Sequence, residues 1–299
     1  MRRFGRRSPA PPVPETEEPD DQPVGLFQLY PDPELSGSSG VETNVDIIAI
    51  HGLGGHPYKT WTDGQKLWLR DFLPKDLNRA RILTFGYNAG LAFTSSKSTI
   101  RDYSIQLLES LRQLRRRTAN DDVKTIFVCH SLGGIVFKEA LIVAHERTMT
   151  YGSVAASVKG VVFLGTPHRG SNMAYWSGLL TKFANIAVLG RLRQDLLDNL
   201  QPKSSELDTI SAQFVERGMT LQIFSLYERL TMPVINSLVV DEFSAVLHLP
   251  NETAVPLEAN HQTICKFLTS SNPSYIRVRD CIDEIVETLV KLAGKSCTS

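Results

Sequence analysis

The chain has 299 residues, of which 42% are hydrophobic and 21% charged, and its 32 basic residues balance its 32 acidic residues to a formal net charge of +0. This length and composition are ordinary for a soluble globular protein and leave room for one large domain. The neutral balance lacks the basic footprint that nucleic-acid binding requires, and no apolar run reaches the ~20 residues of a membrane-spanning helix.

The first 24 residues differ from the rest in composition. Four arginines, six prolines and five acidic residues leave almost no apolar side chain to bury, which predicts a disordered tail over residues 1–24. Its acids and prolines disfavour a mitochondrial presequence, because such a segment is poor in acids and forms an amphipathic helix. No apolar signal-peptide core follows the first methionine, so we expect a cytoplasmic protein or one associated with an organelle or membrane inside the cell.

From residue 25 onward, apolar runs alternate with helical periods. The pattern predicts strands over residues 26–30, 45–50, 81–87, 125–128 and 161–164, and helices over residues 99–117 and 132–145. Strands and helices that alternate in this way predict a parallel, doubly wound sheet. Ligands bind such a sheet at the carboxyl ends of its strands, so we look for the functional residues there.

The second apolar run ends in a glycine-rich loop. Residues 46–55 read DIIAIHGLGG, and the loop contains His51, Gly52, Leu53 and Gly54. A tetrahedral oxyanion needs two converging backbone N–H donors, and we expect the N–H of Leu53 to be one of them. The alternative is a phosphate-binding loop, which the sequence disfavours because no Gly-Lys-Ser or Gly-Lys-Thr follows.

Residues 125–135, TIFVCHSLGGI, end an apolar run on Ser131 and then turn helical. A strand–turn–helix of this kind holds a catalytic serine in a strained, positive-φ conformation that requires small residues two positions away. Gly133 meets this requirement, whereas Cys129 stands where a glycine is usual. The N–H of Leu132 is the expected second oxyanion donor. The alternative is a glycine-rich turn of a non-enzymatic α/β protein.

Residues 170–217 follow the predicted strand over residues 161–164. An apolar stripe over residues 176–189 has helical spacing, which fits ordinary core packing, a roof over an acyl pocket, or peripheral contact with a membrane. Helices are predicted over residues 192–200 and 204–216, and a long amphipathic helix over residues 275–292.

A serine hydrolase of this type needs an acid and a histidine after the serine, in that order. We favour His261 as the general base, because it ends a strand-like run and precedes a segment, residues 263–268, that we expect to be helical. His168 precedes every candidate acid, and His248 lies in a turn region. His130 is expected to face away from the site.

The acid has two candidates. Glu228 follows the predicted strand over residues 221–227, and Asp241 follows the apolar run over residues 238–240. We favour Glu228, because a position at the end of a strand holds a carboxylate rigidly against an imidazole. A serine–histidine dyad without a fixed acid, or another carboxylate, is the remaining alternative.

Five stretches in register resemble the lipase-like serine esterase domain of the serine-active-site-containing protein family: GLGGHPYKTW, ILTFGYN, CHSLGGIVFKEAL, VVFLGTPHRGS and NHQTICKF. Fungal NLR-like proteins carry a similar domain, and GPI inositol-deacylases are related to it. The resemblance implies an α/β-hydrolase domain over residues 25–295, with a mostly parallel sheet, helices on both faces and a lid-like insertion over about 170–217.

The resemblance also implies a function. It points to a Ser-His-acid hydrolase that cleaves a phospholipid or another acyl ester. No cofactor or metal is expected, since the four cysteines show no metal-binding spacing. Two alternatives stay open: a catalytically weak signalling or adaptor domain that keeps the hydrolase scaffold, and thioester or amide cleavage by the same residues.

Overall fold

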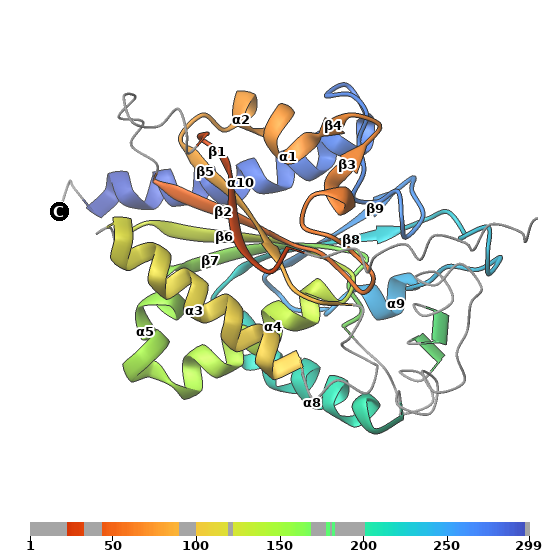
Figure 1. The fold of residues 1–299 in the computed structure, drawn as a ribbon, viewed down its shortest axis with the longest axis horizontal. Coiled ribbons are helices and arrows are strands. Elements are labelled where there is room, and N and C mark those ends of the chain that lie inside the picture. Colours follow the sequence, from red (N-terminus) through yellow and green to blue (C-terminus); the bar gives the residue numbers. More distant parts are fainter. Residues whose placement is uncertain are drawn as a thin grey trace, which may run out of the picture.

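The computed structural model describes residues 23–32, 44–89, 100–118, 122–168, 178–179, 181–182 and 201–296. These residues form a seven-stranded sheet with helices on both of its faces (Figure 1). The strand order is β1-β5-β2-β6-β7-β8-β9, in which β1 is antiparallel to β5 and the other neighbours are parallel. The predicted mostly parallel α/β sheet is therefore confirmed, while the predicted tail lies almost wholly outside the described residues.

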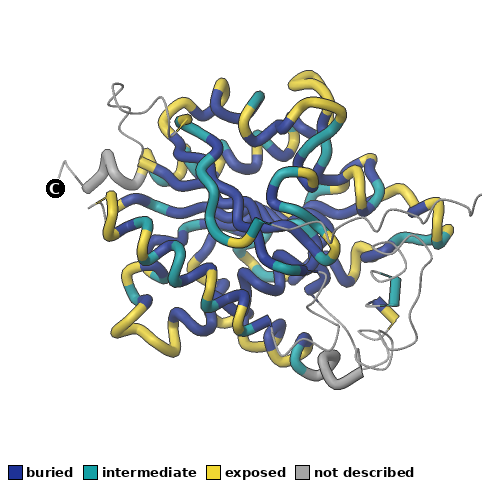
Figure 2. The backbone as a smooth tube through the Cα atoms, viewed as in Figure 1, coloured by how far each residue is buried: buried dark blue, intermediate teal, exposed yellow. Residues whose placement is uncertain are grey.

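The strands of the main sheet match the apolar runs of the sequence. Because helices cover both faces, β2 and β5 are buried along their whole length (Figure 2). A short hairpin forms a separate two-stranded sheet. The strands are β1 (Gly25–Tyr30), β2 (Val45–Ile50), β3 (Thr62–Asp63), β4 (Lys66–Leu67), β5 (Ala80–Gly86), β6 (Lys124–His130), β7 (Val158–Leu164), β8 (Gln222–Glu228) and β9 (Glu252–Leu257).

Two groups of helices bury separate apolar cores against the sheet. One face carries α3 (Ile100–Thr118), α4 (Gly133–Glu146), α5 (Thr148–Ser157) and α8 (Gln201–Gly218) (Figure 1). The other face carries α1 (Trp68–Asp71), α2 (Leu73–Asp76) and α10 (Pro273–Ser296), and a 3-10 turn covers Lys59–Trp61. A last short helix, α9 (Glu242–Ala245), lies near the carboxyl ends of the strands.

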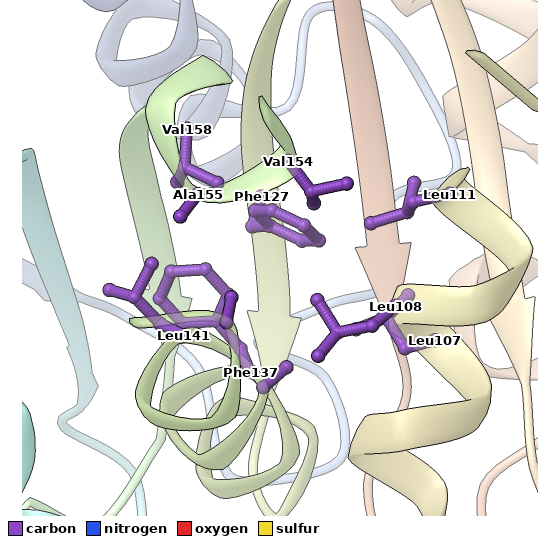
Figure 3. A pocket seen from close by; sticks show the side chains of 11 residues that line it. Leu107, Leu108, Leu111, Phe127, Phe137, Leu141, Val154, Ala155 and Val158 are labelled. Carbon is purple, nitrogen blue, oxygen red and sulfur yellow. The ribbon is translucent and has the colours of Figure 1, made fainter. Parts of the chain in front are cut away.

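One part of the core is incompletely filled. A gap of about 10 Å³ lies between α3, α4, α5 and β6. Its lining is entirely apolar and includes Leu108, Phe127, Phe137 and Val154 (Figure 3). A gap of this size and polarity has no partners for a water molecule.

The prediction for residues 263–268 needs correction. Residues 263–265 form turns and residues 266–268 are not helical, because a short apolar pattern does not by itself distinguish a helix from turns. In this segment the carbonyl oxygen of Cys265 accepts a hydrogen bond from the Trp68 indole at 2.9 Å. Most of the predicted lid, including the helix over residues 192–200, lies outside the described residues. Its last helix, α8, buries Phe214 in the core beside α4 and belongs to the body of the domain. Within the described ranges, no helix has the length and apolar character needed to cross a bilayer.

Candidate active site

Ser131 occupies a tight turn between β6 and α4. Its φ is +53°, in the left-handed region that a non-glycine residue adopts only under strain. Hydrogen bonds to neighbouring β7 hold this conformation: the Ser131 N–H donates to the Leu164 carbonyl at 3.0 Å, and the Thr166 hydroxyl donates to the Ser131 carbonyl at 3.1 Å. The turn therefore presents the serine at the carboxyl end of the sheet.

The small residues after the serine are required by close contacts with adjacent strands. A Cβ added at Gly133 would lie 2.4 Å from the carbonyl oxygen of Ile50, and one added at Gly134 would lie 2.3 Å from Thr166 Cγ2. Cys129, which replaces the usual glycine before the serine, points into the core. Burial raises the pKa of its thiol well above the ordinary value, so the sulfur stays neutral.

Three buried side chains form a continuous hydrogen-bonded chain at this edge. The Nε2 atom of His261 lies 3.0 Å from Ser131 Oγ, and its Nδ1 atom lies 3.2 Å from Glu228 Oε1. Glu228 is the last residue of β8, and its Oε1 also accepts the Val240 N–H at 2.7 Å. This geometry allows the imidazole to take a proton from the serine while the carboxylate holds its other nitrogen.

The structure places Asp241 elsewhere. Its carboxylate accepts the Ser244 N–H at 2.9 Å and so caps the N-terminus of α9. The loop that contains Asp241 still serves the site, because the preceding residue, Val240, donates its N–H to Glu228. Of the two acids proposed from the sequence, the structure thus brings Glu228 to His261.

His130 does not face away from the site, contrary to the sequence prediction. Its Nε2–H donates to the carbonyl oxygen of His261 at 2.9 Å, and the two imidazole rings lie 5.1 Å apart. Burial, followed by the nearby His261, lowers the pKa of His130 to about 3. The ring is therefore neutral, with its proton on the nitrogen that bonds to His261.

The His51 side chain holds the glycine-rich loop in place. The buried His51 ring stacks on Tyr87 at 4.5 Å, and its Nδ1–H donates to the Gly52 carbonyl at 2.9 Å. Burial lowers the pKa of His51 to about 4, so this ring is neutral too. A turn follows, in which the Gly55 N–H donates to the Gly52 carbonyl and Gly54 has a φ of +62°.

The loop lies directly against the candidate nucleophile. A Cβ added at Gly52 would lie 2.7 Å from Ser131 Cβ, so only glycine fits there. Leu53 follows, and Leu132 precedes the first turn of α4. Among the described residues, no backbone carbonyl accepts a hydrogen bond from the N–H of Leu53 or of Leu132.

The other histidines considered in the sequence have different surroundings. His168 is buried against Phe163, with the ring centroids 4.5 Å apart, and its backbone N–H donates to Ser244. His248 is exposed in an irregular loop segment and has a φ of +58°. Within the described ranges, no group of three or more His, Cys, Asp or Glu side chains is placed to hold a metal ion.

The sequence reasoning missed three groups that hold the site together: the Val240 N–H, the Thr166 hydroxyl and the His130 ring. Thr166 belongs to the stretch GTPHRG. Its position directly after the end of β7 is the feature of the sequence that could have indicated a role at the site. No local pattern marks the other two: the Val240 N–H is a backbone group that any residue carries, and the His130 ring acts on a residue 131 positions away.

Comparison with known proteins identifies relatives. Residues 45–205 match the family model described as "Putative serine esterase (DUF676)". The protein named Protein SERAC1 from Bos taurus is 28% identical over 273 residues, which cover 83% of this chain and 39% of the relative. Protein SERAC1 from Homo sapiens is 27% identical over 267 residues, with 81% and 38% covered. The chain thus spans about two fifths of the length of these curated relatives.

A solved structure shows the same fold. The mature form of the Bacillus licheniformis lipase BlEst2 superimposes with a TM-score of 0.57 and 20% sequence identity. The match covers 85% of this chain and 97% of the lipase. The sheet order and the position of Ser131 between β6 and α4 therefore belong to an α/β-hydrolase fold.

Proposed function

The chain belongs to the DUF676 serine esterase family, and we propose that it is a carboxylic ester hydrolase of the lipase and esterase type that cleaves its ester through Ser131, His261 and Glu228. The observation that carries this proposal is the hydrogen-bonded chain from Ser131 Oγ through His261 to Glu228. Fold alone would not assign these roles, because one fold hosts many activities.

In the proposed reaction, Ser131 Oγ attacks the acyl carbonyl carbon while His261 Nε2 takes its proton. Glu228 holds the proton on His261 Nδ1 and stabilises the positive charge that forms on the ring. Its position at the end of a buried strand, with Val240 fixing Oε1, keeps the carboxylate in place during this step.

The N–H groups of Leu53 and Leu132 would bind the oxygen that becomes negative in the tetrahedral intermediate. The positive end of the α4 dipole adds to this stabilisation. The leaving alcohol takes the proton from His261, which leaves the acyl group on Ser131. A water molecule, deprotonated by His261, then releases the acid and restores the serine.

For the substrate, we propose an acyl ester of a lipid or phospholipid. Three large apolar side chains are exposed after the carboxyl end of β8, at the sheet edge that carries Ser131: Leu230 (47% exposed), Val234 (58%) and Phe243 (62%). Exposed apolar side chains favour contact with an acyl chain or with a membrane surface. A short ester gains little from it.

A fluorophosphonate probe tests the proposed nucleophile. The probe should label Ser131, identified by peptide mapping, and Ser131→Ala should lose both labelling and esterase turnover. Asp241→Asn serves as a folded control that keeps both. Absence of labelling in correctly folded protein would contradict the proposal and favour the signalling or adaptor function.

Acyl-chain dependence tests the proposed substrate class. kcat/KM should rise from an acetyl to a decanoyl ester of the same alcohol. Phe243→Ser should reduce turnover of the decanoyl ester and leave the acetyl ester nearly unchanged, because Phe243 would contact only the longer chain. Equal effects on both esters would contradict the lipid assignment without affecting the role of Ser131.

A further inference from the structure

A second hollow lies at the opposite edge of the sheet from Ser131. It has a volume of about 300 Å³ and is formed by the ends of α4 and α8, by α5, and by the beginnings of β7 and β8. Parallel strands begin at this edge and deliver Ser131 and Glu228 at the other, so the hollow is separate from the candidate active site.

The rim of this hollow is basic. His145, Lys159 and Arg217 line it, and no ion pair joins Lys159 or Arg217 to an acidic side chain within the described part of the chain. Arg217 donates from one terminal nitrogen to the Gln213 carbonyl at 2.8 Å. Its Nε is buried and has no hydrogen-bond partner among the described residues. A buried donor without an acceptor costs free energy, which a bound anion would recover.

Helix capping accounts for only part of this arrangement. Cations near the ends of α4 and α8 complement the helix dipoles, which suits His145 and Arg217. Lys159, however, comes from β7, and its charge adds to theirs at the same hollow. Burial and then the positive charge of Arg217 lower the pKa of His145, so these two groups act on each other directly.

The floor of the hollow is apolar and continues inward. Leu141, Ala155 and Val158 line both the hollow and the neighbouring apolar gap between α3, α4, α5 and β6 (Figure 3). The same three side chains therefore separate a basic opening from an incompletely packed apolar interior. A ligand that fits both surfaces has a charged head and an apolar body.

We infer that this hollow binds an amphiphilic anion, with a carboxylate or phosphate head among His145, Lys159 and Arg217 and a short apolar chain against Leu141, Ala155 and Val158. The inference does not depend on the proposed hydrolysis, because none of these residues belongs to the candidate active site. A fatty-acid anion and a lipid phosphate share this chemistry, and the tests below distinguish the contributions of head and chain.

The His145 imidazole reports binding directly by NMR. In the full chain carrying Ser131→Ala, octanoate should shift the His145 ring resonances saturably and raise the His145 pKa, since the added negative charge offsets that of Arg217. The uncharged 1-octanol should leave that pKa unchanged. Inorganic phosphate should bind more than tenfold more weakly than octanoate, because it has no apolar chain to bury.

Matched variants assign the response to this site. Arg217→Gln and Lys159→Gln should each weaken octanoate binding about tenfold, whereas Lys291→Gln, on the exposed side of α10, should not change it. When the same three substitutions are made in the chain that keeps Ser131, none of them should change esterase turnover. An octanoate affinity that is unaffected by Arg217→Gln overturns the inference. Equal affinities for octanoate and inorganic phosphate would contradict the proposed binding of an apolar chain.

Discussion

The Nε2–H of His130 donates to the backbone carbonyl oxygen of His261 across 2.9 Å, so the residue before the candidate nucleophile holds the backbone of the candidate base. The next residue, Ser131, bonds to the ring of the same histidine at 3.0 Å. The two contacts fix both ends of His261 relative to the turn. His130 is thus a positioning residue, acting on the reaction through His261.

Removing this contact should slow catalysis without abolishing it. We expect His130→Ala to lower kcat about tenfold or more, because small misplacements of a catalytic group cost large factors in rate. His130→Gln offers an N–H donor of similar reach and should recover most of that loss. Steady-state kinetics on both variants provides the measurement, and equal losses in the two would contradict the positioning role.

The buried histidines should make stability depend on pH. The pKa values of His51 and His130 lie near 4 and 3 in the folded protein, below their ordinary value of 6.5. As the pH falls below about 6.5, the unfolded chain therefore binds protons that the folded chain does not, and stability falls by about 1.4 kcal/mol per pH unit for each ring.

His130→Gln removes the contribution of His130 to this pH dependence. Urea unfolding between pH 6.5 and pH 4.5 should show a slope for this variant that is smaller by about 1.4 kcal/mol per pH unit than for the unmodified chain. An unchanged slope would mean that His130 is protonated in the folded state.

The two candidate acids should respond differently to loss of charge. In Glu228→Gln the amide oxygen can stay at the Oε1 position, and its NH₂ group can take the place of Oε2, which has no hydrogen-bond partner in the described structure. The imidazolium then lacks its counter-charge, so kcat should fall about 10³-fold or more. Asp241→Asn should have little effect on kcat or on stability, because asparagine also caps helices well.

The substitution Gly52→Ala, which adds one methyl group, tests whether the glycine-rich loop must lie close to Ser131. Gly52→Ala places a Cβ 2.7 Å from Ser131 Cβ, so the loop must move. We expect kcat to fall about 10²-fold, the cost of losing one oxyanion donor. In Gly152→Ala, whose added Cβ has its nearest neighbour at 3.8 Å, activity should be retained. That helix should gain about 0.5–1 kcal/mol, seen as a higher Tm.

Lys138 should destabilise the fold. The buried Nζ of Lys138 lies 5.5 Å from the Phe214 ring centroid and has no hydrogen-bond partner in the described ranges. Burial lowers the pKa of Lys138 to about 7, although the negative charge of Glu252 opposes this shift. The cost of burying its charge is full below pH 7 and disappears toward pH 10.5, where the unfolded lysine also loses its proton. Lys138→Met should therefore add about 2–4 kcal/mol to the unfolding free energy at pH 6 and less at pH 9.

Chemical unfolding at the two pH values measures this gain. Lys291→Met, at an exposed lysine of α10, serves as the control and should change stability by less than about 0.5 kcal/mol. A loss of stability in Lys138→Met at pH 6 would show that the cation–π contacts outweigh the cost of burial.

Local features of the sequence were sufficient to predict most of the fold. Apolar runs identified the strands, and helical spacing identified α3, α4, α8 and α10, because both patterns repeat within neighbouring residues. Helix α5 was missed: its residues TMTYGSVAAS carry no clear apolar period. The segment over residues 263–268 was wrongly predicted as helix, because a short apolar pattern does not by itself distinguish a helix from turns.

The sequence by itself also determined where a serine could be mounted, since the strand, the turn glycines and the following helix are consecutive. It left Glu228 and Asp241 as alternatives, and it placed His130 on the wrong side. Only the tertiary structure decided these points, because the partners of His261 are 33 and 131 residues away along the chain. Which of the two carboxylates meets the imidazole depends on how β8 and the loop before α9 pack together, and no short stretch of sequence encodes that packing.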